Sequence, residues 1–134
     1  YALCASQWHK SLSYKDKYFG GGMKYAADFK KKFDYEPPYQ AAESSAALLV
    51  FKDAFERANS FDTKKVRDAL AATEMQTFYG NIKFAPGCQN ISKPMVLFQV
   101  ICNDDGSKCE NKVVAPLKWA SAELVHPIPK WSDR

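Results

Sequence analysis

The sequence predicts a mixed fold in which helices come first and strands follow. Three stretches in which apolar residues recur with helical spacing are 23–33, 39–59 and 63–73. Three extended runs bounded by turn residues follow at 80–84, 95–101 and 112–116. A run of helices followed by a run of strands is typical of an α+β arrangement when only these patterns are considered.

The first helix is expected to end before two consecutive prolines. Met23, Ala26 and Phe29 share one side of the stretch 23–33, and lysines occupy the other side. Proline disfavours helical geometry in the residue before it, so Pro37 ends this segment. Pro38 suits the entry of the next helix, because its missing N–H and fixed φ cost nothing there.

The stretch 39–59 has the most regular helical pattern of the chain. Its apolar ladder, in steps of four, consists of Ala42, Ala46, Val50, Ala54 and Ala58. These mostly small residues predict close packing on a sheet or on another helix. Ala47, Phe51 and Phe55 form a second apolar side, so we expect cover from two directions. The chain alone is therefore predicted to be marginally stable or aggregation-prone.

The remaining elements are shorter. Ser60 or Asp62 can cap the helix 63–73. The run around Ile82 alternates apolar and polar residues before a Pro-Gly turn, and Gly80 marks a point where the backbone needs freedom or close approach.

Composition indicates a globular protein. Of the 134 residues, 46% are hydrophobic and 25% are charged, which argues against disorder. The net charge of +4 is modest, and the lysines decorate helix faces, so no nucleic-acid partner is expected. The longest apolar run, 46–51, is far short of a membrane span, and no N-terminal signal pattern is present.

Four cysteines indicate an oxidising compartment. Cys102 and Cys109 bracket an Asn-Asp-Asp-Gly turn, and paired strands would make a disulfide across that hairpin easy to form. Zinc bound with His9 and His126, or reduced buried thiols, are the alternatives, although the spacing of a metal site is absent. Asn90 begins a glycosylation sequon, which matters only in a eukaryotic protein.

Catalytic motifs are absent from the sequence. The Gly20–Gly22 run lacks the Lys-Ser/Thr of a phosphate-binding loop. His9 could act as a general base, but no partner is identifiable. We therefore expect a protein that is not an enzyme and that holds no cofactor and no metal.

The segment 77–100, TFYGNIKFAPGCQNISKPMVLFQV, carries a family resemblance. The pattern G-x-I-K-F-x-x-G-x-N followed by K-P-M-V-x-x-Q-V resembles the C-terminal part of type I periplasmic substrate-binding proteins, in particular the branched-chain amino-acid and amide binders of ABC transporters. The segment 5–20 and the ending P-x-P-x-W-x-x-R are similar to the same family. The resemblance implies an α/β fold, part of a two-lobed type I periplasmic-binding fold, with helices packed on an incomplete sheet plus C-terminal hairpin strands.

The resemblance also implies a division of the chain. Residues 1–8 would form a strand end and hinge crossing, 9–79 the helical part of one lobe, and 80–134 a second hinge crossing and the terminal strands. Members of the family are more than twice as long, so the chain resembles a C-terminal portion. A missing N-terminal portion or a companion chain would supply the rest. Cys4 and Cys88 fall near the hinge connections, which makes their pairing a possibility.

The implied function is extracytoplasmic solute binding. A small polar ligand such as an amino acid or amide would be captured in the interlobe cleft and delivered to a membrane permease. The ligand-binding ectodomain of a receptor, with a receptor module as partner, is one alternative. A repurposed structural subunit of a larger assembly is another.

Two pairs of residues are predicted to contact the ligand. Gln7 and Trp8 follow the strand end, where the resemblance implies the second of the family's three hinge crossings. Tyr39 and Gln40 begin the long helix, where free backbone N–H groups and the positive end of the helix dipole suit a carboxylate. The alternative for Trp8 is packing, and Tyr39 could simply fix the start of the helix.

Overall fold

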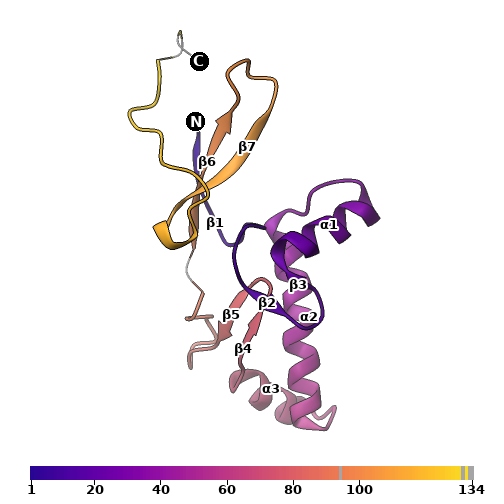
Figure 1. Cartoon of the computed structure of the whole chain (residues 1–134). Helices are drawn as coiled ribbons and strands as arrows, with labels where there is room; N and C mark the ends of the chain where they lie inside the picture. Colours follow the sequence, from indigo (N-terminus) through magenta and orange to yellow (C-terminus); the bar gives the residue numbers. More distant parts are fainter. Residues whose placement is uncertain (94, 131, 133–134) are drawn as a thin grey trace.

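The computed structural model describes residues 1–93, 95–130 and 132. Its elements, in chain order, are β1 (Leu3–Ser6), β2 (Lys15–Asp16), β3 (Gly20–Gly21), α1 (Gly22–Phe33), α2 (Tyr39–Ala58), α3 (Thr63–Ala71), β4 (Glu74–Thr77), β5 (Gly80–Lys83), β6 (Val96–Cys102), β7 (Cys109–Ala115) and a 3₁₀ turn, η1 (Leu117–Trp119). The three helices lie at one end of the molecule and the longest strands at the other (Figure 1).

The largest sheet has three antiparallel strands in the order β1-β6-β7. Strand β1 pairs with β6, which is distant in sequence, and β6 and β7 form a hairpin that joins Cys102 to Cys109. Fully buried Gln99 fastens other segments to this sheet. Its amide nitrogen donates to the carbonyls of Tyr1 and Val125, each at 3.2 Å, and its oxygen accepts from the Val125 N–H at 2.9 Å.

The three helices end as their sequences dictate. The C-cap residues of α1 and α2 are Asp34 and Asn59. Both adopt the left-handed backbone conformation that short polar side chains tolerate. Helix α3 begins at Asp62, whose carboxylate accepts a hydrogen bond from the Lys65 N–H at 3.0 Å. None of the helices in the part of the chain that the structure describes is long and apolar enough to cross a membrane.

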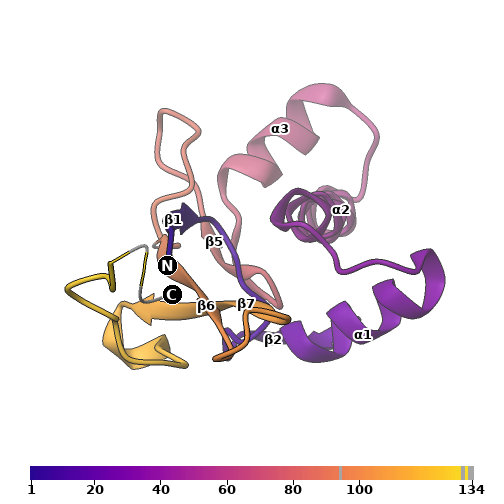
Figure 2. The same cartoon turned by 90° about the horizontal axis from the view of Figure 1, so that it is seen from above.

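The core lies where α1 and α2 meet the β4–β5 hairpin. Phe78, which is fully buried, lies between these strands, and its ring stacks on Tyr25 of α1 with centroids 4.2 Å apart. Trp8 and Phe19 contact Phe78 edge-on at 6.1 and 5.1 Å. The apolar side of α2, through Ala42, closes this aromatic cluster. Figure 2 looks along α2 and shows the strands on one side of it.

The side chain of Lys93, which lies between β5 and β6, packs on the β4–β5 turn. Gly80 has φ +153°, and a Cβ there would come within 2.7 Å of the Lys93 side chain, so only glycine fits this position without strain. The Lys93 ammonium lies 4.1 Å from the centroid of the Tyr79 ring. Within the described ranges, this buried nitrogen has no hydrogen-bond partner, and burial lowers the pKa of Lys93 to about 8.

The structure contains a disulfide between Cys102 and Cys109 at the tip of the β6–β7 hairpin. Cys4 and Cys88 are both free and exposed. The proposed pairing of Cys4 with Cys88 is therefore wrong for this folded chain, because Cys4 lies on β1 and Cys88 lies in the turn after β5. Asn90, the sequon residue, folds back on that turn, where its side-chain amide donates to the Asn81 carbonyl at 3.2 Å.

Candidate functional site

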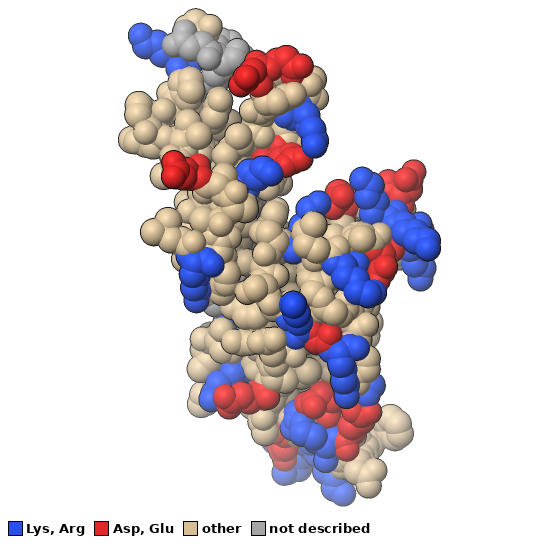
Figure 3. Space-filling model, in the orientation of Figure 1, with Lys and Arg blue, Asp and Glu red and all other residues tan. Residues whose placement is uncertain are grey.

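A groove of about 770 Å³ separates the three-stranded sheet from the helices. It is visible in Figure 3 as the hollow between the sheet end of the molecule and the helical part. The loop after β1, the connection between α1 and α2, and strand β7 form its walls. The residues that line it and enter the argument below are Trp8, His9, Lys10, Glu36, Tyr39, Glu110, Asn111 and Lys112.

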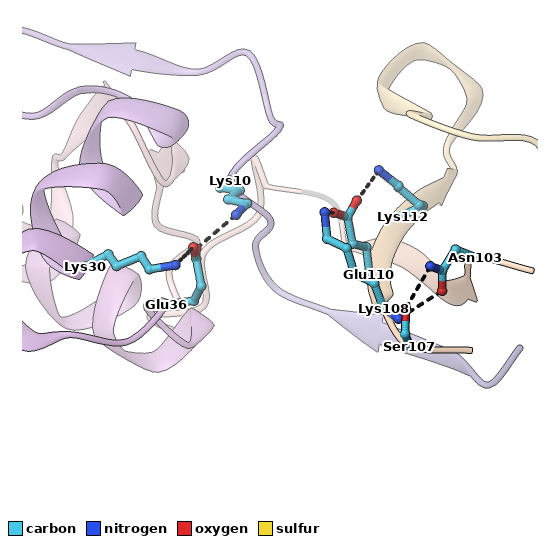
Figure 4. Close-up of polar contacts among 8 residues, drawn as sticks. All are labelled: Lys10, Lys30, Glu36, Asn103, Ser107, Lys108, Glu110 and Lys112. Atoms are coloured by element: carbon cyan, nitrogen blue, oxygen red, sulfur yellow. Dashed lines mark hydrogen bonds and ion pairs between the residues drawn. The ribbon is translucent and has the colours of Figure 1, made fainter. Parts of the chain in front are cut away.

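One wall of the groove carries a basic–acidic–basic cluster. The Lys10 ammonium lies 2.9 Å from the Glu36 carboxylate, and Lys30 of α1 reaches the same carboxylate at 3.5 Å (Figure 4). The hydrogen bond from Lys10 lowers the pKa of Glu36, so this carboxylate stays charged at neutral pH. All three side chains are largely exposed, so these ion pairs contribute little stability, and the charges remain available for exchange with a ligand.

The facing wall, on β7, carries a second cluster of the same kind. Glu110 lies between Lys108 at 2.9 Å and Lys112 at 2.5 Å (Figure 4). Hydrogen bonds from these two lysines lower the pKa of Glu110. Each cluster therefore has one carboxylate paired with two lysines, and of these residues Lys10, Glu36, Glu110 and Lys112 line the groove.

His9 links the two walls. Its Nδ1 accepts a hydrogen bond from the Ser11 N–H at 3.2 Å, and the ring also hydrogen-bonds the backbone of Asn111 on β7. Burial is the main cause that lowers the pKa of His9, with Lys10 and Lys112 adding to it. An Nδ1 that accepts from a backbone N–H belongs to a neutral imidazole. His9 is thus uncharged at neutral pH and joins the loop after β1 to the sheet.

Acid is expected to destabilise the chain through His9. Because the pKa in the folded state lies below 6.5, the unfolded state binds more protons just below that pH. The free energy of unfolding should therefore be fully retained above about pH 6.5 and fall as the pH drops below it. The measurement is urea unfolding at pH 5 and pH 7.5 for the unchanged chain and for His9→Gln. A smaller pH difference in His9→Gln is expected, whereas exposed His126→Gln should behave like the unchanged chain. Equal pH differences in all three would contradict the role of His9.

Comparison with known proteins connects this geometry to a family. A sequence model of the family described as "Periplasmic binding protein" matches residues 3–107, most of the chain. The chain belongs to the periplasmic binding protein family. Among solved structures, a leucine-binding protein, LivK, from Thermotoga maritima is similar at 26% sequence identity with a TM-score of 0.62. The match covers 81% of this chain but 29% of LivK, so this periplasmic binding protein chain spans under a third of that structure.

The four residues predicted to contact the ligand of this periplasmic binding protein chain differ in how accessible they are from the groove. Tyr39 lines the groove and is 37% exposed. Trp8 also lines it, but only 5% of its surface is exposed, and its indole N–H donates to the Phe78 carbonyl at 3.4 Å. Gln7 and Gln40 are neighbours of these two in the chain and are not among the lining residues. Tyr39 is thus the most accessible of the four from the groove.

The start of α2 faces this groove with its capping requirements unmet. Pro38 is the N-cap and provides no side-chain hydrogen bond, and the first turn holds no acidic residue. The Pro38 carbonyl accepts from the Ala41 N–H at 3.0 Å, so the N–H groups of Tyr39 and Gln40 precede the first intrahelical bond. Free donors and a positive helix end favour an anionic group at this point.

Sequence reasoning missed the two charged clusters. Lys10 and Glu36 are 26 residues apart in the chain, and Glu110 comes from a strand much later. Nothing in the local pattern around any of them differs from an ordinary solvated surface. Only the pairing of β1 with β6 brings β7 opposite the loop that contains Lys10, so the fold itself was needed to find them.

Proposed function

We propose that this chain is the ligand-cleft portion of a solute-binding protein that captures a small polar ligand, such as an amino acid or amide, for transport across a membrane. The observation that supports this most is the groove between the sheet and the helices. It combines apolar side chains with charges of both signs and lies where two parts of a binding fold would close on each other. The family membership and the name of the similar leucine-binding protein support the same ligand class.

The chemistry of the groove fits a zwitterion. The N–H groups at the start of α2 suit a carboxylate, and Glu36 or Glu110 can exchange a lysine partner for a ligand ammonium. The Tyr39 ring supplies a flat apolar surface for a side chain. We propose Tyr39 and Gln40 as contacts of the ligand carboxylate. Trp8 and Gln7 would support the base of the groove.

Extracytoplasmic placement belongs to the same proposal. The Cys102–Cys109 disulfide suits an oxidising compartment, and periplasmic binding proteins act outside the cytoplasm. Delivery of the ligand to a membrane permease would follow capture.

Tyr39→Ala is expected to weaken ligand binding about tenfold or more, the equivalent of about 1.4 kcal/mol, because the flat apolar surface of the ring is lost while the helix start is kept. The test is calorimetric titration of the complete gene product that contains this chain with a panel of amino acids that includes leucine. Tyr35→Ala is the matched control, because Tyr35 is exposed and does not line the groove.

Binding of at least one amino acid, weakened by Tyr39→Ala and unaffected by Tyr35→Ala, is the expected result. Lack of binding of every amino acid and amide in the panel would reject solute capture. Binding that survives Tyr39→Ala unchanged would keep the function but move the site away from the start of α2.

A further inference from the structure

The loop after β1 connects the two sides of the groove. His9 lies in this loop, lines the groove and is half-buried, and its ring interacts with the backbone of Asn111 on β7. The next residue, Lys10, contacts the Glu36 carboxylate in the connection between α1 and α2 at 2.9 Å (Figure 4). Residues 9–11, which we call the latch loop, therefore tie the sheet to the helical end of the molecule.

The latch loop requires an uncharged imidazole. The Nδ1 atom of His9 accepts a hydrogen bond from the Ser11 N–H at 3.2 Å and lies 2.8 Å from the Ser11 hydroxyl. A protonated Nδ1 carries a hydrogen and cannot accept from a backbone N–H. The hydroxyl can rotate and accept from the protonated ring, but the Ser11 N–H loses its acceptor. Protonation of His9 therefore breaks one of the hydrogen bonds that shape this loop.

The surroundings of His9 also oppose a positive charge on its ring. Burial lowers the pKa of His9 most, and Lys10 on the same loop and Lys112 on β7 lower it further, whereas the Asn111 backbone acts in the opposite direction. The carboxylates of Glu36 and Glu110 contact Lys10 and Lys112, respectively. Hydrogen bonds from lysines lower the pKa of both carboxyl groups, so these two stay ionised at pH 5 while His9 gains a proton.

Acid favours any state in which the His9 ring leaves this position. In a released loop the ring is hydrated and lies away from the two lysines, so it takes up a proton near the usual pKa of about 6.5. The released state then binds the proton more tightly than the latched state, and a fall in pH below about 6.5 shifts the equilibrium towards release. Well above that pH the ring is neutral in both states, and the latch holds.

We propose that His9 is a pH-dependent latch of the groove, which holds the sheet and the helical end together at neutral pH and lets them separate in acid. The protein then captures its solute at neutral pH and releases it where its surroundings are acidic. The release of solute rests on the function proposed above, whereas the latch itself needs no ligand.

The distance between two spin labels tests the latch in the ligand-free protein. The labels are attached at Asp28→Cys on α1 and at Leu117→Cys on η1, two exposed positions that do not line the groove. Cys4→Ser and Cys88→Ser remove the two exposed native thiols from the complete gene product that contains this chain. We expect the distance between the labels to increase as the pH falls from 7.5 to 5, with a midpoint below pH 6.5.

Two histidine variants of the labelled protein separate the latch from other effects of acid. His9→Gln cannot take up the proton, so its label distance should be the same at both pH values. His126→Gln changes an exposed histidine that does not line the groove, and it should behave like the labelled protein with both histidines. Far-ultraviolet circular dichroism of the same samples distinguishes opening from unfolding.

A label distance that does not change between pH 7.5 and pH 5 would overturn the proposal. An increase of the same size in His9→Gln would overturn it as well, because the proton would then act elsewhere. Loss of the helical signal before the distance changes would show that acid unfolds the protein instead of opening the groove, and would have the same consequence.

Calorimetric titration with amino acids at the two pH values tests the release of solute. We expect the affinity of the unchanged protein to fall at least about threefold from pH 7.5 to pH 5, and that of His9→Gln to stay constant. An equal fall in both would overturn the release step. Absence of binding at either pH, together with a label distance that increases in acid, would reject solute capture and leave the latch standing.

Discussion

Phe78→Ala is expected to leave the 134-residue chain unfolded at 25 °C. Phe78 is fully buried, and its ring contacts Trp8, Phe19 and Tyr25, so its removal opens a cavity in the middle of the core. Truncation of a buried phenylalanine costs about 3–5 kcal/mol, which is comparable to the whole stability of a small domain. Far-ultraviolet circular dichroism and urea titration measure the result.

Phe61→Ala is the matched control for this prediction. It removes the same atoms from a residue that is 89% exposed, and the change in the free energy of unfolding should stay within about 0.5 kcal/mol. A Phe78→Ala variant that unfolds at the same urea concentration as Phe61→Ala would show that the aromatic cluster is not the core of the chain.

The chain on its own is expected to be marginally stable and to associate as the protein concentration rises. Large apolar side chains are left in water on one side of α2 and just after it, at Leu48, Phe51, Phe55 and Phe61, and each would contribute about 1.5–3 kcal/mol if it were fully buried. Leu48→Lys with Phe51→Lys should reduce association at least severalfold, as measured by light scattering at equal protein concentration. The same number of lysines at Ile91 and Leu117, which are 63% and 88% exposed and lie outside α2, should have a smaller effect.

A cooperative melt at a typical domain temperature, from a monomeric sample of the unchanged chain, would contradict this expectation. Equal association of the two lysine pairs would show that general hydrophobicity, rather than this side of α2, causes self-association.

The helices could be predicted because their signals are local. The stretch 39–59 became α2, Tyr39–Ala58, since the ladder of small residues and the Pro38 entry act within a few residues of each other. The strands were less predictable. β4, Glu74–Thr77, has no strong alternation and exists because β5 pairs with it, and β7 begins at Cys109 because the disulfide-bonded hairpin extends the pairing beyond the apolar residues.

The candidate site also contains some residues whose placement could be predicted and others whose placement could not. Tyr39 could be predicted to face a cleft because the start of a helix is a local feature with known chemistry. Trp8 was assigned with it, yet the structure buries most of the ring against Phe78, a contact across 70 residues that no local pattern reveals. The lowered pKa of His9 likewise depends first on burial, which only the fold produces, and then on Lys10 and on Lys112, which the fold brings from β7.

The three-stranded sheet is joined to the helical end at two places in the described part of the chain, after Ser6 and before Val96 (Figure 1). These two residues are register partners on neighbouring antiparallel strands. Because both connections leave the sheet at neighbouring residues, they hold the same end of the sheet. The segment after β7 stays on the sheet, since Ser121 and Val125 both bond to it. Opening of the groove should therefore move β1, β6 and β7 together as one sheet relative to the helices.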